Sequence, residues 1–328
     1  MYHQTNMYYK VIFLLIVLLF ILPCSSQNMQ KLDGTTYDAN TGEPLPYVNI
    51  MVMNRQFGTT SDSNGRFLLE NKQLKYTDTL YFSYVGFISK RIQVNEILGG
   101  DIKLQPRNIL LDEVNVYDVK KNNSSKIVEL NKFKKRKTSL VYSKEPFDNK
   151  GGLWVPYREM EPSIETMYFQ NIYKNDKYVQ LKEVNINLKS FKEKSKFRLR
   201  LFQASNDKKP GREISLKTSI YEATNQNSVV NINLSDENIY LSNNGIFIGI
   251  EYLLIEDNLT IITNDNESKE AKLYSPFLKY TRVKENFEYY IFFNAKWQKI
   301  RKKAPNYTDP NDTDTFSYRP AISIKIAG

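Results

Sequence analysis

The chain has 328 residues, with 46 Lys and Arg against 36 Asp and Glu, and a formal net charge of +10. Its single cysteine, Cys24, and its single histidine, His3, both lie within the first 26 residues. If that segment is removed, the remaining chain has no disulfide, no thiolate or imidazole for zinc or copper, and no imidazole for Ser–His–Asp or Cys–His catalysis.

The N-terminal segment has the layout of a secretory signal peptide. Lys10 precedes an apolar run over residues 11–22, and Pro23 and small residues follow it. The run is shorter than the about 20 residues that a membrane-spanning helix needs, which disfavours an uncleaved anchor. We therefore predict a signal peptide over residues 1–26 with cleavage after Ser26, and an exported protein of the periplasm or outer membrane. Lipidation at Cys24 is the alternative.

Residues 28–117 read as short strands separated by turns. The first expected strand covers residues 31–38, and the prolines of "GEPLP" indicate a connection or an edge. Residues 47–53 alternate, with Val48, Ile50 and Val52 on one face. Residues 78–94 predict a strand pair bent at Gly86, and residues 101–104 and 114–117 predict two more strands. This spacing is typical of an all-β sandwich.

Four motifs in order carry a family resemblance: "GTTYDANTGEPLPYVNI", "TSDSNGRF", "LYFSYVGF" and "LDEVNV". Residues of about 30–117 thus resemble the carboxypeptidase regulatory-like domain, a transthyretin-like β-sandwich common in envelope proteins of Bacteroidetes-type bacteria. The resemblance implies an accessory module and not the zinc peptidase, so no peptidase activity is carried over. Receptors with this domain continue into a long series of barrel strands, and no such series follows here.

Two local motifs of this domain have a structural interpretation. Asn64-Gly65 predicts a hairpin with a type I′ turn, because both residue types tolerate positive φ. Asp62 also begins a faint calcium-loop pattern, but the twelfth position is Gln73 and not Glu, so the hairpin is preferred. Tyr84 and Phe87 are expected in the sandwich core.

Residues 118–162 read as a basic linker. Ile127, Leu130 and Phe133 recur at helical spacing, which predicts a short helix over residues 126–137. The linker also carries a basic cluster, for which contact with an anionic membrane surface is the functional reading and a solvated face is the simpler one. The cluster consists of Lys132, Lys134, Lys135, Arg136 and Lys137. Because an exported protein rarely meets nucleic acid, no nucleic-acid partner is expected.

Residues 163–328 alternate more strongly and predict a larger antiparallel, jelly-roll-like β-sandwich. Expected strands cover residues 178–190, 197–201, 230–234, 246–256, 288–293 and 321–326, and Pro210-Gly211 is expected in a turn. This half loosely resembles the β-sandwich that accompanies the first domain in many Bacteroidetes envelope proteins, a resemblance with no established activity to transfer.

The predicted ligand contacts are aromatic side chains: Trp154, Tyr157, Trp297 and Tyr307. The loop "NYTDPNDTDTF" could also hold calcium through Asp309, Asp312 and Asp314, although turn formers of this kind more often make a surface turn. No catalytic residue, cofactor or metal site is assigned.

The sequence thus favours a non-catalytic envelope scaffold of two β-sandwiches that binds a protein or a glycan. The first alternative is a carboxylate-dependent glycosidase, for which Glu251 and Glu256 flank an apolar strand without a second acid to pair with. The second alternative is a membrane-surface adaptor that acts through the basic cluster.

Overall fold

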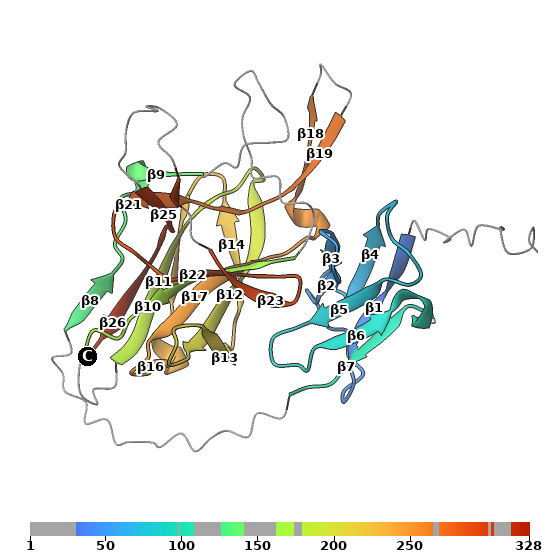
Figure 1. The fold of residues 1–328 in the computed structure, drawn as a ribbon, viewed down its shortest axis with the longest axis horizontal. Helices are drawn as coiled ribbons and strands as arrows, with labels where there is room; N and C mark the ends of the chain where they lie inside the picture. Colours follow the sequence, from blue (N-terminus) through green and yellow to red (C-terminus); the bar gives the residue numbers. More distant parts are fainter. Residues whose placement is uncertain are drawn as a thin grey trace, which may run out of the picture.

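The computed structural model describes residues 31–97, 99–107, 126–140, 162–173, 179–264, 269–300, 303–304 and 316–328. These residues form β-strands and short 3-10 helices, in two sandwiches that lie side by side (Figure 1). None of the helices in the described ranges has the length and apolar character needed to cross a membrane. The expected all-β fold class is confirmed.

The N-terminal sandwich pairs a three-stranded sheet of order β4-β1-β7 with a four-stranded sheet of order β3-β2-β5-β6. Its apolar core includes Val48, Ile50, Leu80 and Phe82, each 0% exposed. The elements are β1 (Lys31–Asp38), β2 (Asn49–Val52), β3 (Gly58–Thr60), β4 (Arg66–Glu70), β5 (Thr79–Ser83), β6 (Lys90–Gln93), η1 (Val94–Glu96) and β7 (Asp101–Leu104). The predicted strands in this range are confirmed, while the one over residues 114–117 lies outside the described residues.

The predicted hairpin at Asn64-Gly65 is wrong. Strand β3 pairs with β2 and β4 pairs with β1, so the turn between β3 and β4 connects the two sheets of the sandwich. Only Gly65 has a positive φ, of 75°, whereas a type I′ turn needs two such residues. The Asp62 carboxylate accepts the backbone N–H groups of Asn64 and Arg66, at 2.8 and 2.9 Å, and thereby fixes this corner.

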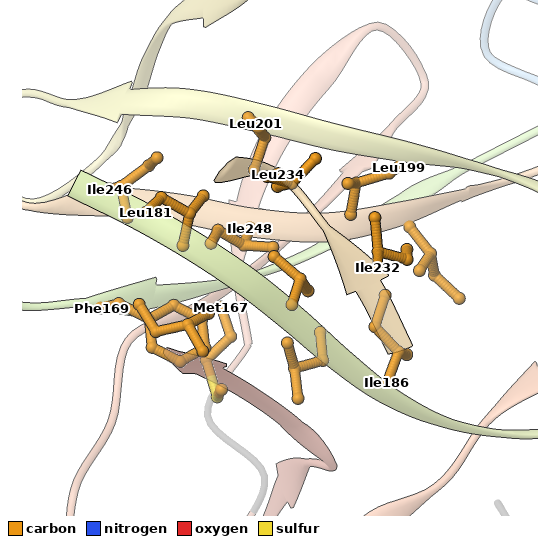
Figure 2. Close-up of a cluster of buried hydrophobic side chains, with 14 of the residues drawn as sticks. Met167, Phe169, Leu181, Ile186, Leu199, Leu201, Ile232, Leu234, Ile246 and Ile248 are labelled. Carbon is orange, nitrogen blue, oxygen red and sulfur yellow. The ribbon is translucent and has the colours of Figure 1, made fainter. Parts of the chain in front are cut away.

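The second sandwich packs a sheet of order β13-β12-β17-β10-β22-β23 against a sheet of order β15-β11-β26-β8. Figure 2 shows part of the core between them, where Leu199 and Ile248 of the first sheet meet Ile186 and Ile232 of the second. The strands of these two sheets are β8 (Ile127–Leu130), β10 (Ile164–Phe169), β11 (Val179–Lys189), β12 (Lys194–Ala204), β13 (Pro210–Ile214), β15 (Val229–Asn233), β17 (Ile246–Tyr252), β22 (Tyr289–Phe293), β23 (Lys296–Lys299) and β26 (Ile322–Ala327).

Shorter elements extend this sandwich. Strand β14 adds to β12, and β16 and β20 add to β11, while β24-β25-β21-β9 and β18-β19 form separate small sheets. Their bounds are β9 (Thr138–Ser139), β14 (Ile220–Thr224), β16 (Tyr240–Leu241), β18 (Leu259–Asn264), β19 (Lys269–Tyr274), β20 (Phe277–Leu278), β21 (Tyr280–Val283), β24 (Lys303–Ala304) and β25 (Phe316–Pro320), with η2 (Lys135–Lys137), η3 (Ser235–Glu237) and η4 (Glu256–Asn258) between them.

The predicted helix over residues 126–137 is also wrong. Residues 127–130 form edge strand β8, which pairs with β26 at the far end of the chain. Val128 and Leu130 pack against the core, whereas Ile127 is 62% exposed. Buried side chains therefore recur every two residues, as in a strand, and not every 3.6 residues, as in a helix. Pairing with β26 also gives the strand hydrogen bonds that the isolated segment lacks. Pro210-Gly211, expected in a turn, begins β13, and the turn itself closes between Ser205 and Lys209.

Gly249 permits the close approach of two central strands. A Cβ atom at this position would lie 1.8 Å from the backbone oxygen of Glu165 and 2.6 Å from Cα of Thr166, on neighbouring strand β10. Gly249→Ala should therefore force β10 and β17 apart and cost about 1–3 kcal/mol of unfolding free energy, as for other overpacked sites. Urea denaturation would measure this loss, with Gly211→Ala as the control at a less crowded site. An unchanged midpoint for Gly249→Ala would contradict the expected clash.

Candidate functional site

The two sandwiches meet at a buried polar cluster, here called the joint. It comprises Arg198, Arg200 and Glu251 from the second sandwich and Tyr47 and Asn49 from the first. Antiparallel register places Arg198 directly opposite Glu251, and the alternation along β12 points Arg200 to the same face. That face of the sheet lies toward the N-terminal sandwich, beside β2 and β3 (Figure 1).

Glu251 is the centre of the joint and is 1% exposed. Arg198 Nη1 lies 2.5 Å from Glu251 Oε2, and Arg200 Nη1 lies 2.6 Å from Oε1. Asn49 Nδ2 donates a further hydrogen bond to Oε1 at 2.6 Å. Arg200 Nε also donates to Glu213, so each buried charge has a charged partner.

The N-terminal sandwich completes this network with backbone and ring atoms. Arg198 Nη2 donates to the carbonyl oxygen of Tyr47 at 2.8 Å, and its guanidinium carbon lies 5.0 Å from the ring centroid of Tyr84. Thr60 Oγ1 donates to Asn49 Oδ1 at 2.8 Å and accepts the backbone N–H of Leu254 at 3.0 Å. The orientation of the two sandwiches is thus fixed by directional, charge-assisted contacts.

The charges at the joint hold one another in their ionised forms. Burial alone would raise the pKa of Glu251, but attraction to Arg200 and Arg198 lowers it below the ordinary value for glutamate. Burial alone would lower the pKa of Arg200, but Glu213 and Glu251 raise it above the usual arginine value. Glu251 therefore remains a carboxylate, with its oxygen atoms engaged by three donors.

This geometry does not suit Glu251 for acid–base chemistry. Glu256, the other carboxylate at the end of the apolar strand, is exposed in η4, whereas Glu251 is buried at the joint. The two groups thus lie in different environments and share no site. The contacts of Glu251 position the two domains, and they leave neither of its oxygen atoms free for proton transfer.

A second buried carboxyl group lies on the opposite face of the same sheet. Glu165 of β10 is 1% exposed and accepts hydrogen bonds from Tyr252 at 3.1 Å, from Tyr280 at 2.5 Å and from Tyr289. The three hydroxyl groups come from β17, β21 and β22. Glu165 thereby ties three strands together inside the apolar core.

Trp297, a predicted ligand contact, belongs to an aromatic cluster on the joint side of the sheet. It is half-buried on β23, with its ring centroid 5.1 Å from that of Phe202 and 5.2 Å from that of Phe292. Phe292 in turn lies 6.4 Å from Tyr81 of the N-terminal sandwich. Trp297 thus packs within the protein, and its role in ligand contact stays a prediction.

Trp297→Ala should destabilise the protein by roughly 1–3 kcal/mol, because each of its two edge-to-face pairs contributes roughly 0.5–1.5 kcal/mol beyond burial. Trp297→Phe retains an aromatic ring and should lose less. Thermal unfolding of both variants measures the difference. Equal stability of Trp297→Ala and wild type would show that the ring contacts contribute nothing and would leave ligand contact as its role.

The other predicted contact residues, Trp154, Tyr157 and Tyr307, lie outside the described residues, as do His3 and Cys24. The calcium candidates Asp309, Asp312 and Asp314 also lie outside them. Within the described part of the chain, no group of three or more His, Cys, Asp or Glu side chains is arranged to hold a metal ion.

The basic cluster lies on the exposed segment between β8 and β9. Lys132, Lys134, Lys135, Arg136 and Lys137 are all exposed, and the last three form η2. Lys132 makes an ion pair of 3.4 Å with Glu129. The cluster therefore belongs to the surface of the second sandwich, beside the edge strand, and not to an amphipathic helix.

Sequence reasoning missed the joint. Arg198 and Arg200 alternate with apolar residues, and such a pattern normally places charged residues in water. One signal was present, because Glu251 interrupts a strand that is otherwise apolar from Ile246 to Ile250. A single acidic residue such as Glu251 in a central strand needs buried cationic partners. Arg198 and Arg200, two positions apart on another strand, could supply them.

Comparison with known proteins identifies the first sandwich. Residues 32–116 match the CarboxypepD_reg-like domain. No curated protein sequence matches the chain. One similar solved structure is a "putative carbohydrate binding protein" from Bacteroides uniformis ATCC 8492, with 12% identity over 78% of this chain and 100% of that chain, and a TM-score of 0.20. A score this low supports no inference about this chain.

Proposed function

We propose, from the premise that residues 32–116 are a carboxypeptidase regulatory-like domain, that the protein is a non-catalytic binding scaffold of the cell envelope. Its partner is a protein or a glycan of the periplasm or outer membrane. Export rests on the signal-peptide pattern of residues 1–26.

The joint is the observation that carries this proposal. Arg198, Arg200 and Asn49 contact one buried carboxylate, and Arg198 also donates to the carbonyl oxygen of Tyr47, which argues that the two sandwiches act as one rigid unit. Rigid elements hold a binding surface in place, so less conformational freedom is lost on association. Such a unit suits a module that presents surfaces to a partner.

The same contacts argue against the carboxylate-dependent enzyme. A glycosidase needs two carboxyl groups roughly 5–10 Å apart beside the scissile bond. Glu251 is enclosed by arginines, and Glu165 is enclosed by tyrosine hydroxyls, so neither is available to a substrate. The contacts of Glu251 and Glu165 therefore favour a binding protein over a carboxylate-dependent enzyme.

Capture from an envelope extract tests the proposal. The purified folded chain should retain a partner saturably, and the heat-unfolded chain should not. Protease treatment of the extract should abolish capture of a protein partner, whereas periodate oxidation should abolish capture of a glycan. Absence of capture from the extract, together with no signal on a glycan array and no hydrolysis products, would reduce the role to a passive structural one.

A further inference from the structure

Three lysines from separate elements gather at one end of the second sandwich. Lys135 begins η2, Lys189 ends β11, and Lys279 lies between β20 and β21. Pairing of Lys189 with Phe277 and of Leu188 with Leu278 places Lys279 beside Asn187 on the neighbouring strand. We call these three residues the lysine triad.

A chain of hydrogen bonds through Asn187 connects the elements that bear the triad. The backbone N–H of Lys279 donates to the carbonyl oxygen of Asn187 at 2.9 Å. Asn187 Nδ2 donates to Thr138 Oγ1 at 2.7 Å, and Thr138 Oγ1 donates to the carbonyl oxygen of Lys135 at 2.8 Å. Since Asn187 is fully buried, the triad is built on a fixed support.

No carboxylate neutralises the triad among the described residues. The ion pairs of this part of the chain involve other lysines and arginines, and none includes Lys135, Lys189 or Lys279. The Lys189 ammonium lies 5.3 Å from the ring centroid of Phe191, a cation–π contact that brings no opposite formal charge.

The triad carries a charge that no carboxylate pairs with among the described residues, and this is unfavourable for the folded chain. Partial burial lowers the pKa of Lys279, and repulsion from Lys189 and Lys135 lowers it further. A bound anion would relieve the repulsion, because it supplies an opposite charge that the described residues do not place beside the triad. In an anion-binding site, repulsion between like charges lowers the stability of the folded protein, and binding of the anion removes that repulsion.

The surroundings of the triad fit a glycan better than a bilayer. The turn that leads into β15 carries exposed amides, Asn225, Gln226 and Asn227, and the next residue, Ser228, accepts the backbone N–H of Leu188 at 2.6 Å. Amides can donate to and accept from sugar hydroxyl groups. None of the large apolar side chains exposed in the described residues lies on η2, β11, β20 or β21, so membrane insertion lacks an anchor there.

From this arrangement we infer that the lysine triad binds the sulfate, phosphate or carboxylate group of an acidic glycan, while the neighbouring amides contact its hydroxyl groups. The inference rests on the proposed binding function and names a ligand class for it. Lys135 belongs to the basic cluster that the sequence shows, and the proposed site adds Lys189 and Lys279, which are far from it in the chain.

Dextran sulfate is the probe, and neutral dextran of equal size is its control. Wild type should bind dextran sulfate saturably and neutral dextran weakly. The triple variant combines Lys135→Gln, Lys189→Gln and Lys279→Gln, and it should bind about tenfold or more weakly. The plot of log affinity against log salt has a negative slope, and its magnitude should decrease by roughly 2, at about 0.7 per lost contact. The matched variant with Lys31→Gln, Lys72→Gln and Lys296→Gln loses the same charge from exposed sites and should bind almost as wild type does.

Two further measurements keep the test decisive. Lys135→Gln with Lys189→Gln leaves the partly buried Lys279 intact and should still lose several-fold in affinity. Lys279→Met should keep or raise the melting temperature without ligand, because it removes an unpaired charge. A large fall would instead assign Lys279 a structural role and overturn the inference.

The remaining outcomes also count against the site. Equal losses in the triad variant and the matched control would show non-specific charge attraction, and binding to phosphatidylglycerol vesicles but not to dextran sulfate would assign the triad to a membrane. If wild type does not bind dextran sulfate but still captures its partner from envelope extract, the inferred anion site is wrong and the proposed scaffold function stands. Loss of both would remove the proposed function as well.

Discussion

Glu251→Gln is expected to lower the free energy of unfolding by roughly 3–5 kcal/mol, the usual cost of breaking a buried charged network from one side. The substitution leaves the guanidinium groups of Arg198 and Arg200 buried beside a neutral amide. Urea denaturation followed by tryptophan fluorescence measures the loss. Glu256→Gln, the same change at an exposed position, should stay within about 0.5 kcal/mol of wild type.

The joint also predicts how this loss depends on pH. Because the pKa of Glu251 is lowered in the folded state, its contribution is fully present above the unfolded value of about 4.5 and is lost as the pH falls through the folded value. The gap between wild type and Glu251→Gln should therefore be constant near neutral pH and should narrow in acid. A gap that widens in acid would mean that Glu251 is not a stabilised carboxylate.

Glu251→Gln should also uncouple the two sandwiches. After proteolytic cleavage between the two sandwiches, the wild-type fragments should stay associated in gel filtration, whereas the variant should release the N-terminal sandwich. If the variant retained wild-type stability and its cleaved fragments stayed associated, apolar contacts such as Tyr81 with Phe292 would be sufficient to hold the domains. The rigid unit would then not depend on the buried charges.

The second large effect is expected for Glu165→Leu, which should cost roughly 2–5 kcal/mol. Leucine removes the acceptor shared by the hydroxyl groups of Tyr252, Tyr280 and Tyr289, and a buried hydroxyl that loses its acceptor costs about 1–3 kcal/mol. Thermal and urea unfolding would both report the loss.

Two variants separate this explanation from a simple loss of shape. Glu165→Gln keeps an acceptor oxygen and should lose less than Glu165→Leu. Changing the three tyrosines to phenylalanine in the Glu165→Leu background should recover part of the stability, because no polar group then remains to be satisfied. If Glu165→Leu alone were as stable as wild type, the carboxyl group would contribute nothing net to the core.

The local sequence pattern was sufficient to predict the main strands and the family of the first sandwich. The period-two alternation around Val48 and Val184 predicts which face of a strand is buried, and both residues are 0% exposed. The ordered motifs of the first sandwich predicted the domain that residues 32–116 match. Such signals depend only on neighbours in the chain, so the sequence contains them directly.

Other features depended on contacts between distant residues. Ile127, Leu130 and Phe133 have helical spacing, but β26, almost 200 positions later, recruits residues 127–130 as a strand. Likewise, Asn64-Gly65 suits a hairpin, but the partners of β3 and β4 are β2 and β1, and the turn crosses between sheets. Tertiary pairing overrides a short local preference because it satisfies more backbone groups and buries more apolar surface.

By itself, then, the sequence determined an all-β chain, the faces of its main strands and the family of its first sandwich, because alternation and turn residues are local. Only the tertiary structure decided that Arg198, Arg200 and Glu251 form one buried joint with Tyr47 and Asn49. It also decided that Lys135, Lys189 and Lys279 gather at one end. Charged side chains on a strand look alike in a sequence, whether water or another domain covers them. What distinguishes them is the surface that folds against them.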